Sequence, residues 1–242
     1  MSAAPRYMVT GSLILLPCPI AADTVNAVLP PQVVELARGL DYFLVENAKS
    51  ARAFLKSVGH PTPLRELQIV EIGHEPDASS ITGWLAPLQA GRNGALLSEA
   101  GCPAVADPGA TLVAAAHRLG LRVRPLVGPS SLLLALMASG GNGQRFRFHG
   151  YLPVPGDERA RRLQALERDA RGGESQLFIE TPYRSRAMFE AILAACAPDT
   201  RLSLAMELTA PDEYVRTLSI AEWRSAETPP LERRPAVFSL LR

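Results

Sequence analysis

The sequence has few cysteines. Cys18, Cys102 and Cys196 are the only three in 242 residues, and they form no Cys-x-x-Cys pair and no mixed cysteine and histidine cluster. Structural zinc needs clustered ligands, and small disulfide-stabilised domains are dense in cysteine. We therefore expect neither of these, and we expect the chemistry of the protein to need no metal.

Long hydrophobic runs are also missing. The longest, residues 132–138, is far shorter than the ~20 apolar residues that a helix needs to cross a bilayer. Residues 1–11 lack the basic start, apolar core and small-residue cleavage site of a signal peptide. These absences predict a cytoplasmic protein with no membrane partner.

Common nucleotide-binding and hydrolase motifs are absent. The sequence contains no G-x-G-x-x-G and no G-x-x-x-x-G-K-[ST], so it encodes neither a Rossmann dinucleotide site nor a P-loop. It has no G-x-S-x-G nucleophile elbow and only four histidines, His60, His74, His117 and His149. A Ser-His-Asp hydrolase is therefore weakly supported.

Lysine is scarce. Only Lys49 and Lys56 are lysines among the 25 basic residues, and the other 23 are arginines. Set against 24 acidic residues, they give a formal net charge of +1, which excludes a uniformly basic nucleic-acid coat but allows a local patch. Arginine suits phosphate contacts, although a GC-rich genome gives the same composition.

One segment concentrates this arginine. Residues 145–171 contain seven arginines and four acidic residues, a local excess of three positive charges. It is a candidate phosphate-contacting surface, although such a pattern more often marks a solvated helix face. Phe146, Phe148 and Tyr151 alternate with arginines there and would form either a stacking face for bases or part of the core. We favour the core.

In the first half of the chain, short apolar runs alternate with helical patterns, which is typical of an α/β sheet. We expect strands at residues 13–16, 42–46, 68–72, 94–98 and 122–127, and helices at 48–58, 79–89 and 111–119. A proline-broken loop separates the first two strands. Five strands with crossover helices predict a doubly wound, mostly parallel sheet.

The second half has a different pattern. A helix is expected at residues 132–138, where Ser130 can cap it, and two more at 158–170 and 184–195. Strands are expected at 146–151, 176–180, 202–207, 213–220 and 236–241, with no long helix between the last two. This predicts a mixed sheet. The fold class is therefore α/β with two domains, residues 1–127 and 128–242.

The residues that follow the strands are rich in Gly, Pro, Ser and Glu. In open α/β sheets ligands bind beyond the carboxyl ends of the strands, so these segments are the candidate site, although turns are rich in Gly and Pro in any case. They are residues 17–20, 46–47, 98–103 with 107–109, 128–131, 180–184 and 207–209. The segment 128–131 would hold an anion on free N–H groups, or Ser130 would simply cap its helix.

Three of these segments together resemble one family. Ser98-Glu99-Ala100-Gly101-Cys102-Pro103, then Asp107-Pro108-Gly109, then Gly128-Pro129-Ser130-Ser131 are similar to the motifs of the tetrapyrrole methylase superfamily. The resemblance is greatest to its ribosomal RNA small-subunit methyltransferase I branch and covers residues 13–241. It implies a homodimeric S-adenosylmethionine-dependent methyltransferase that holds its cofactor bent in the cleft between two α/β domains, and 2′-O-methylates a cytidine of 16S rRNA in the small ribosomal subunit.

The resemblance also implies roles for individual residues. Pro19 and Ile20 match the first-strand loop that faces the substrate, and Arg184 would hold a phosphate or only its own helix. The positions that match cofactor-contacting segments are Ala100, Gly101, Cys102, Val105, Ser130, Ser131, Leu132, Ile179, Glu180, Met206, Pro235 and Ala236.

The sequence departs from the branch at three places. Residues 46–49 read Glu-Asn-Ala-Lys instead of Glu-Asp-Thr-Arg, Glu99 replaces an Asp, and residues 233–235 read Arg-Arg-Pro instead of Lys-Gly-Glu. These changes keep two alternatives open. One is a methyltransferase for a tetrapyrrole or other small metabolite, and the other is a non-catalytic protein that binds S-adenosylmethionine or RNA.

Methyl transfer from a sulfonium depends mostly on positioning, but a ribose hydroxyl must also lose its proton. Glu99, Glu46 and His74 are the candidate bases, because all three lie on predicted strand-end loops, as does Glu180. We favour Glu99, which would act as acid or base, face the sulfonium, or only order its loop. His74 would face the substrate or be an ordinary solvated loop histidine.

Overall fold

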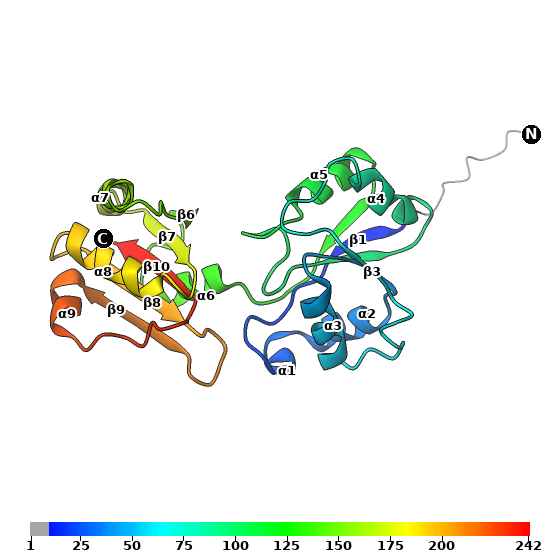
Figure 1. Ribbon diagram of the computed structural model, residues 1–242, viewed down its shortest axis with the longest axis horizontal. Helices are drawn as coiled ribbons and strands as arrows, with labels where there is room; N and C mark the ends of the chain where they lie inside the picture. The colour runs from blue at the N-terminus through cyan, green and yellow to red at the C-terminus, as the bar shows by residue number, and fades with distance from the viewer. Residues whose placement is uncertain (1–9) are drawn as a thin grey trace, which may run out of the picture. The chain divides into compact units, whose positions relative to one another are not determined.

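The computed structural model describes residues 10–242 of the chain (Figure 1). It divides into two compact units, which we call unit 1, ending at Pro129, and unit 2, from Ser130 to Arg242. Both are α/β units, as predicted. The division lies two residues beyond the boundary that the sequence predicts.

Unit 1 is built on a five-stranded parallel sheet. Its strands are β1 (Ser12–Leu15), β2 (Tyr42–Val45), β3 (Gln68–Glu71), β4 (Gly94–Leu97) and β5 (Arg122–Pro125), in the order β3-β2-β4-β1-β5. All four pairings are parallel, so the doubly wound parallel sheet is confirmed. Parallel pairing brings the carboxyl ends of all five strands to one edge of the sheet.

Helices cover both faces of this sheet (Figure 1). Phe43 and Val45 of β2 pack with α1 (Val25–Val28), α2 (Pro31–Arg38) and α3 (Ala48–Ser57). Tyr42 and Leu44 point to the opposite face, against α4 (Ile81–Gln89) and α5 (Ala110–Arg118). A strand buried on both faces reads as a continuous apolar run, which is why β2 and β4 are visible in the sequence.

Helices α1 and α2 correct the prediction of a loop between the first two strands. Pro31 occupies the first turn of α2, where its missing N–H costs nothing and its fixed φ suits a helix. Val33 and Ala37 then bury one face of that helix. The prolines were interpreted as helix breakers, whereas here they start a helix.

Unit 2 is built on a mixed five-stranded sheet. Its strands are β6 (Phe146–Tyr151), β7 (Ser175–Glu180), β8 (Arg201–Met206), β9 (Tyr214–Ser219) and β10 (Ala236–Leu241), in the order β6-β7-β10-β8-β9. β6 pairs parallel with β7, and the other pairings are antiparallel. The predicted mixed sheet is therefore confirmed.

The two faces of the second sheet are covered unequally. Helices α7 (Gly156–Arg171), α8 (Ser185–Ala195) and α9 (Ile220–Ser225) pack on the larger core, where Phe178 and Phe238 stack at 5.5 Å between ring centroids. Helix α6 (Ser131–Ser139) covers the other face through a small cluster that includes Ala135 and Val237. α9 was not predicted, although Ser219 and Glu222 form a capping box at its start.

Two further expectations are wrong. Ser130 stands at the N-cap of α6, but its hydroxyl makes no capping hydrogen bond. Phe146 and Tyr151 are 42% and 57% exposed and so are not core residues, whereas Phe148 is partly buried. β6 is an edge strand, and none of its residues is fully buried.

Within residues 10–242, no helix combines the length and the apolar character that crossing a membrane requires.

Candidate active site

The carboxyl edge of the sheet in unit 1 gathers the loops that the sequence singles out. The loop after β1 and the loop after β4 are joined by two main-chain hydrogen bonds: Cys18 N–H donates to Gly101 O at 2.9 Å, and Gly101 N–H donates to Cys18 O at 3.0 Å. This bridge fixes the start of the glycine-containing segment relative to the first strand.

Glu46, directly after β2, joins the ends of three strands. Its side chain is buried, and Oε1 lies 2.8 Å from Nδ1 of His74, which follows β3. Its other oxygen, Oε2, accepts a hydrogen bond of 3.0 Å from the backbone N–H of Glu99, which follows β4. Two of the predicted candidate bases are thus in direct contact, and the third is held through its backbone.

The Glu46–His74 pair has the geometry of an oriented base. A carboxylate oxygen only accepts, so Nδ1 of His74 is the donor, and the neutral ring keeps its lone pair on Nε2. The His74 side chain is 78% exposed while Glu46 is buried. The buried partner holds the ring, and the exposed ring nitrogen is available to a substrate.

Asn47 and Ser50 support this arrangement. Asn47 caps α3, because its Oδ1 accepts hydrogen bonds from Lys49 N–H at 2.8 Å and Ser50 N–H at 3.2 Å. The Ser50 hydroxyl lies 3.1 Å from the carbonyl oxygen of Asn47 and 3.2 Å from Oε1 of Glu99, so these two acceptors share its one proton. Asn47, one of the departures from the family pattern, therefore serves as a helix cap.

Asp107 is a further acidic residue of the site. It lies in one of the family motifs, but the sequence predicts no chemical role for it. Burial, followed by repulsion from Glu46, raises its pKa from 3.8 to about 6. Ser98 Oγ is buried without a well-formed hydrogen bond in the described chain, yet it lies near enough to favour the charged form of Asp107. Perturbed carboxyl groups of this kind cluster at functional sites. The signal in the sequence was Asp107-Pro108-Gly109 itself.

The segment from Gly101 to Gly109 has a strained backbone. Ala104 and Ala106 adopt φ values of 66° and 64°, in the left-handed region that costs a residue with a Cβ roughly 1 kcal/mol or more. Val105 between them is half exposed. The Cys102 thiol is 3.3 Å from the carbonyl oxygen of Pro129 and ties the turn to the end of unit 1. Such strain is typical of ligand-binding turns.

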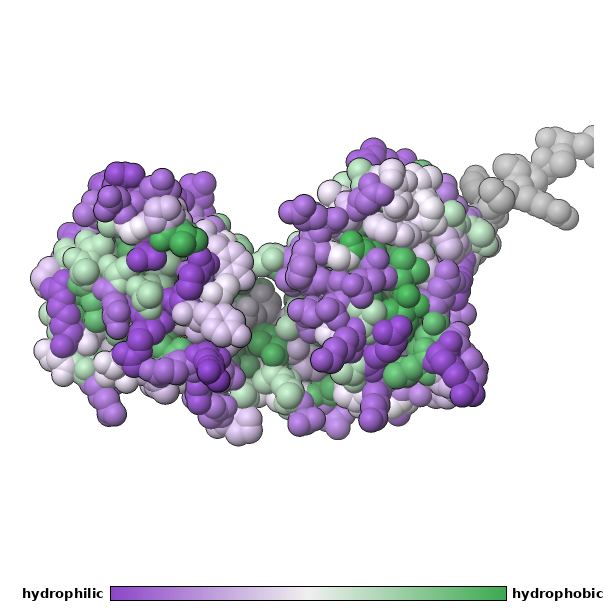
Figure 2. Space-filling view, viewed as in Figure 1, coloured by the Kyte–Doolittle hydropathy of each residue, from purple (hydrophilic) through white to green (hydrophobic). Residues whose placement is uncertain are grey.

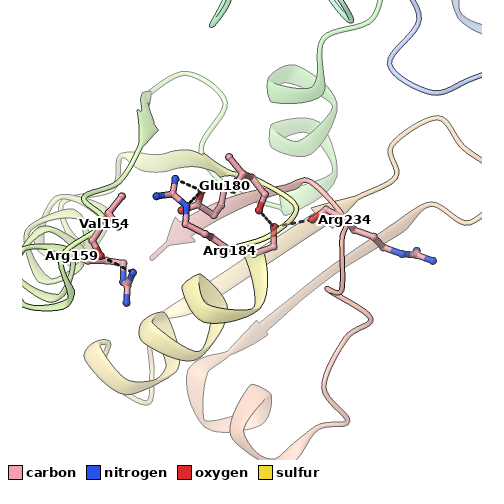
Figure 3. Close-up of polar contacts among 7 residues, drawn as sticks. Val154, Arg159, Glu180, Arg184 and Arg234 are labelled. Atoms are coloured by element: carbon pink, nitrogen blue, oxygen red, sulfur yellow. Dashed lines mark hydrogen bonds and ion pairs between the residues drawn. The ribbon is translucent and has the colours of Figure 1, made fainter.

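In unit 2, Glu180 and Arg184 form a closed group (Figure 3). Oε1 of the buried Glu180 accepts hydrogen bonds from Thr181 N–H at 2.7 Å, from Arg184 Nε at 3.0 Å and from Arg184 Nη2 at 2.7 Å. Arg184 therefore holds the turn before α8. Of the two roles that the sequence allows for Arg184, this is the one in which it holds its own helix and not a phosphate. Arg234 points away from this group and pairs with Asp212.

The remaining predicted residues of unit 2 lie on both faces of its sheet. Ala236 pairs in register with Glu180 on one side and with Met206 on the other, so these three form one row across β7, β10 and β8, and Met206 and Ala236 belong to the larger core. Leu132 of α6 and Ile179 pack against the small cluster on the opposite face. Ser130 and Ser131 begin α6, and Pro235 directly precedes β10. That this row and the strained turn of unit 1 bind one cofactor stays a prediction.

No group of three or more His, Cys, Asp or Glu side chains in the described part of the chain is arranged to hold a metal ion.

Solved structures define the class of fold. The structure of the methyltransferase CobJ matches with a TM-score of 0.62 and 19% identity, covering 95% of this chain and 94% of that one. The uroporphyrin-III-C-methyltransferase from Thermus thermophilus matches with a TM-score of 0.52 and 18% identity, covering 96% and 92%. At such identities the likeness concerns the fold alone, and it is the fold of a two-unit α/β methylase.

Sequence comparison defines the family. The family model of the tetrapyrrole (corrin/porphyrin) methylases matches residues 27–223, so the chain belongs to this family. The ribosomal RNA small subunit methyltransferase I of Pseudomonas aeruginosa is 31% identical over 217 residues, 89% of this chain and 72% of that protein. That of Escherichia coli O157:H7 is 31% identical over 214 residues, 88% and 70%. The predicted family is confirmed, and the chain is an S-adenosylmethionine-dependent methyltransferase.

Proposed function

We propose that this methyltransferase methylates ribosomal RNA of the small subunit at a ribose 2′-hydroxyl. Similarity over 89% of the chain to a protein named for that substrate supports the RNA. The observation that carries the reaction is the Glu46–His74 pair, because a hydroxyl acceptor must lose a proton and this pair presents an oriented base.

The residues present suit the cofactor. When bound, S-adenosylmethionine would supply a methyl group that is attached to a positively charged sulfur. The bond between that sulfur and the methyl carbon breaks readily, and the sulfur is the leaving group. Glu46, Glu99 and Asp107 give the edge of unit 1 a negative potential that favours a cationic group, since Coulombic repulsion from both glutamates acts on Asp107. The half-exposed Val105 offers an apolar contact on a turn that strain and the Cys102 contact define.

The chain's own part in the reaction is then to position groups and to move one proton. His74 Nε2 accepts the proton of the ribose hydroxyl as the oxygen forms its new bond to carbon. Glu46 holds the ring through Nδ1 and stabilises the imidazolium that results. The Glu99 backbone N–H, bound to the other oxygen of Glu46, keeps that carboxylate from rotating.

The surface proposed for RNA lies on β6 and α7. Arg145, Arg147, Arg161 and Arg168 are exposed there, and Phe146 and Tyr151 stand beside them on β6. Figure 2 shows hydrophilic residues over α7, at the upper left. The other three arginines of the segment have partners within the protein: Arg159 contacts Val154 O, Arg162 contacts His149 Nδ1, and Arg171 pairs with Asp199.

The test uses purified enzyme, labelled S-adenosylmethionine and small ribosomal subunits from cells that lack the gene. We expect label in the RNA and a 2′-O-methylated nucleoside on mass spectrometry. Label in neither subunits nor rRNA fragments would refute the proposal. With a ribosomal substrate, the enzyme would work in the cytoplasm.

We also propose a homodimer, which the family resemblance supports. The outer edge of β6 has no neighbouring strand in the described sheet. Light scattering should give twice the mass of one chain. A concentration-independent monomer would contradict this.

A further inference from the structure

A pocket of about 330 Å³ opens in unit 1 beside the Glu46–His74 pair. Its walls come from the loop after β1, from α3 and from the loop after β4. The apolar side chains that matter for its chemistry are Pro19, Ile20 and Phe54, and the polar ones are Asp23, Ser50, Ser57 and Glu99.

The polar groups of this pocket are arranged as hydrogen-bond acceptors. Oε1 of Glu99 lies 3.2 Å from the Ser50 hydroxyl, which also reaches the carbonyl oxygen of Asn47 at 3.1 Å. The Glu99 backbone is fixed by its N–H, which donates to Glu46. The Ser57 hydroxyl donates its hydrogen bond to the carbonyl oxygen of Phe54 at 2.7 Å, so it can only accept a hydrogen bond from a ligand. None of the lining residues is Lys, Arg or His.

This inventory decides the kind of ligand. A phosphate would meet two carboxylates, Asp23 and Glu99, and no cation, so the pocket does not suit the RNA backbone. A group that donates hydrogen bonds suits it, and the apolar Pro19, Ile20 and Phe54 suit a flat ring next to that donor. An unstacked nucleobase with an exocyclic amino group has both properties. A carboxylate accepts from the N4 amino group of cytosine and repels the O4 carbonyl of uracil.

We propose that this pocket receives a nucleobase of the RNA substrate and that the Glu99 carboxylate recognises its exocyclic amino group. The proposal rests on the proposed RNA methylation. It gives Glu99 the role of a specificity-determining residue and leaves the proton transfer to His74.

The experiment first maps the methylated nucleotide by mass spectrometry, then compares small subunits reconstituted with cytosine, uracil or adenine at that nucleotide. One good hydrogen-bonded pair discriminates against the wrong base by about 5- to 150-fold. We expect the wild-type enzyme to prefer an amino-bearing base over uracil by a factor in that range. The adenine arm shows whether the pocket also admits a purine.

Glu99→Gln is the decisive variant, because an amide both donates and accepts and so pairs with either kind of base. The preference for an amino-bearing base over uracil should fall to less than about threefold, since the source of discrimination is lost. The control is Glu66→Gln, a surface carboxylate outside the pocket, which should keep the wild-type preference.

Several outcomes overturn the proposal. One is a mapped target that is uracil, and another is an equal rate on all three bases with the wild-type enzyme. A third is a preference for an amino-bearing base that survives Glu99→Gln, and at least tenfold weaker binding of S-adenosylmethionine to that variant in calorimetry would then assign Glu99 to the cofactor. Absence of methylation on every RNA is a different result, because it refutes the proposed function itself.

Discussion

Glu46 and His74 form a pair in which the carboxylate is buried and the imidazole is exposed, with 2.8 Å between Oε1 and Nδ1. The carboxylate is also fixed from its other side by the Glu99 N–H. A loop histidine with no such partner would sample many orientations, whereas this one presents Nε2 in a defined direction.

Removing this histidine should slow the chemical step. For His74→Ala we expect the single-turnover methylation rate to fall about 10²- to 10⁴-fold, because a general base typically contributes that much. His117→Ala, at the exposed end of α5, is the control and should keep the wild-type rate. Equal single-turnover rates for His74→Ala and wild type would exclude His74 as the base.

Glu46→Gln tests positioning separately from proton transfer. The side-chain amide of Gln has one oxygen that accepts and one NH2 group that donates. The NH2 group would therefore face either the His74 Nδ1–H or the Glu99 N–H, and that one of the two hydrogen bonds is lost. We expect kcat to fall by about tenfold with little change in KM, since the interaction strengthens only as His74 gains charge. A rise in KM alone would point to a purely structural role.

Asp107 should make stability depend on pH in one direction. Burial and Glu46 raise its pKa from 3.8 to about 6, so the folded chain binds this proton more tightly than the unfolded chain. Stability therefore falls as pH rises from about 4 to about 6. Asp107→Asn should stabilise the protein by about 1 kcal/mol at pH 7.5, allowing for the half exposure of the carboxyl, and by nothing below pH 4.

Urea unfolding at pH 7.5 and pH 4 measures this difference. Asp77→Asn is a control of opposite sign, because hydrogen bonds from Ser79 and Ser80 lower the pKa of the exposed Asp77. That substitution should be destabilising at pH 7.5 and neutral at low pH. A destabilised Asp107→Asn at pH 7.5 would show that the carboxylate is held by partners rather than strained by its neighbours.

Arg184 should matter for stability rather than for RNA. Arg184→Ala leaves the buried Glu180 with only the Thr181 N–H as a partner, and we expect a loss of about 2 kcal/mol in urea unfolding. Glu180→Gln with Arg184→Ala should recover part of this loss, because no buried charge then remains. Unchanged stability together with weaker RNA binding would instead support a phosphate contact.

The arginines on β6 should govern the salt dependence of RNA binding. Replacing Arg145 and Arg147 together by Gln removes two exposed cations. The negative slope of the logarithm of the binding constant against the logarithm of the salt concentration should therefore become shallower by about 1.5 units. Binding titrations with small subunits at several salt concentrations measure it. Arg65→Gln, an exposed residue of unit 1, should leave the slope unchanged. An unchanged slope in the double variant would place the RNA surface elsewhere.

Strands β2 and β4 of unit 1 were predictable because strands buried on both faces are continuous apolar runs. Tyr42 to Val45 illustrates this, since all four residues are buried and the sequence marks them clearly. α2 was missed because Pro30 and Pro31 look like breakers from the sequence, and only the buried Val33 and Ala37 reveal the helix. α9 was missed because it is six residues long, too short for a periodic pattern.

The candidate site was predictable as a set of loops but not as a set of contacts. Strand-end position gave Glu46, His74 and Glu99, yet the contact between the first two depends on β2 and β3 being neighbours in register. The raised pKa of Asp107 depends on burial, which no motif reports. Phe146 and Tyr151 were assigned to the core because aromatic residues in strands usually are, and the order of the strands put them on an edge.

The double engagement of Glu46 links two events in thermodynamic terms. A ligand that shifts the Glu99 backbone changes the hydrogen bond to Oε2 and thereby the orientation of the same carboxylate that holds His74. Linkage is reciprocal, so whatever free energy the occupied pocket contributes to orienting the imidazole, the oriented imidazole returns as affinity for the occupant. Selection of the nucleobase and orientation of the His74 imidazole would then be a single cooperative property of this enzyme, set by the buried carboxylate of Glu46.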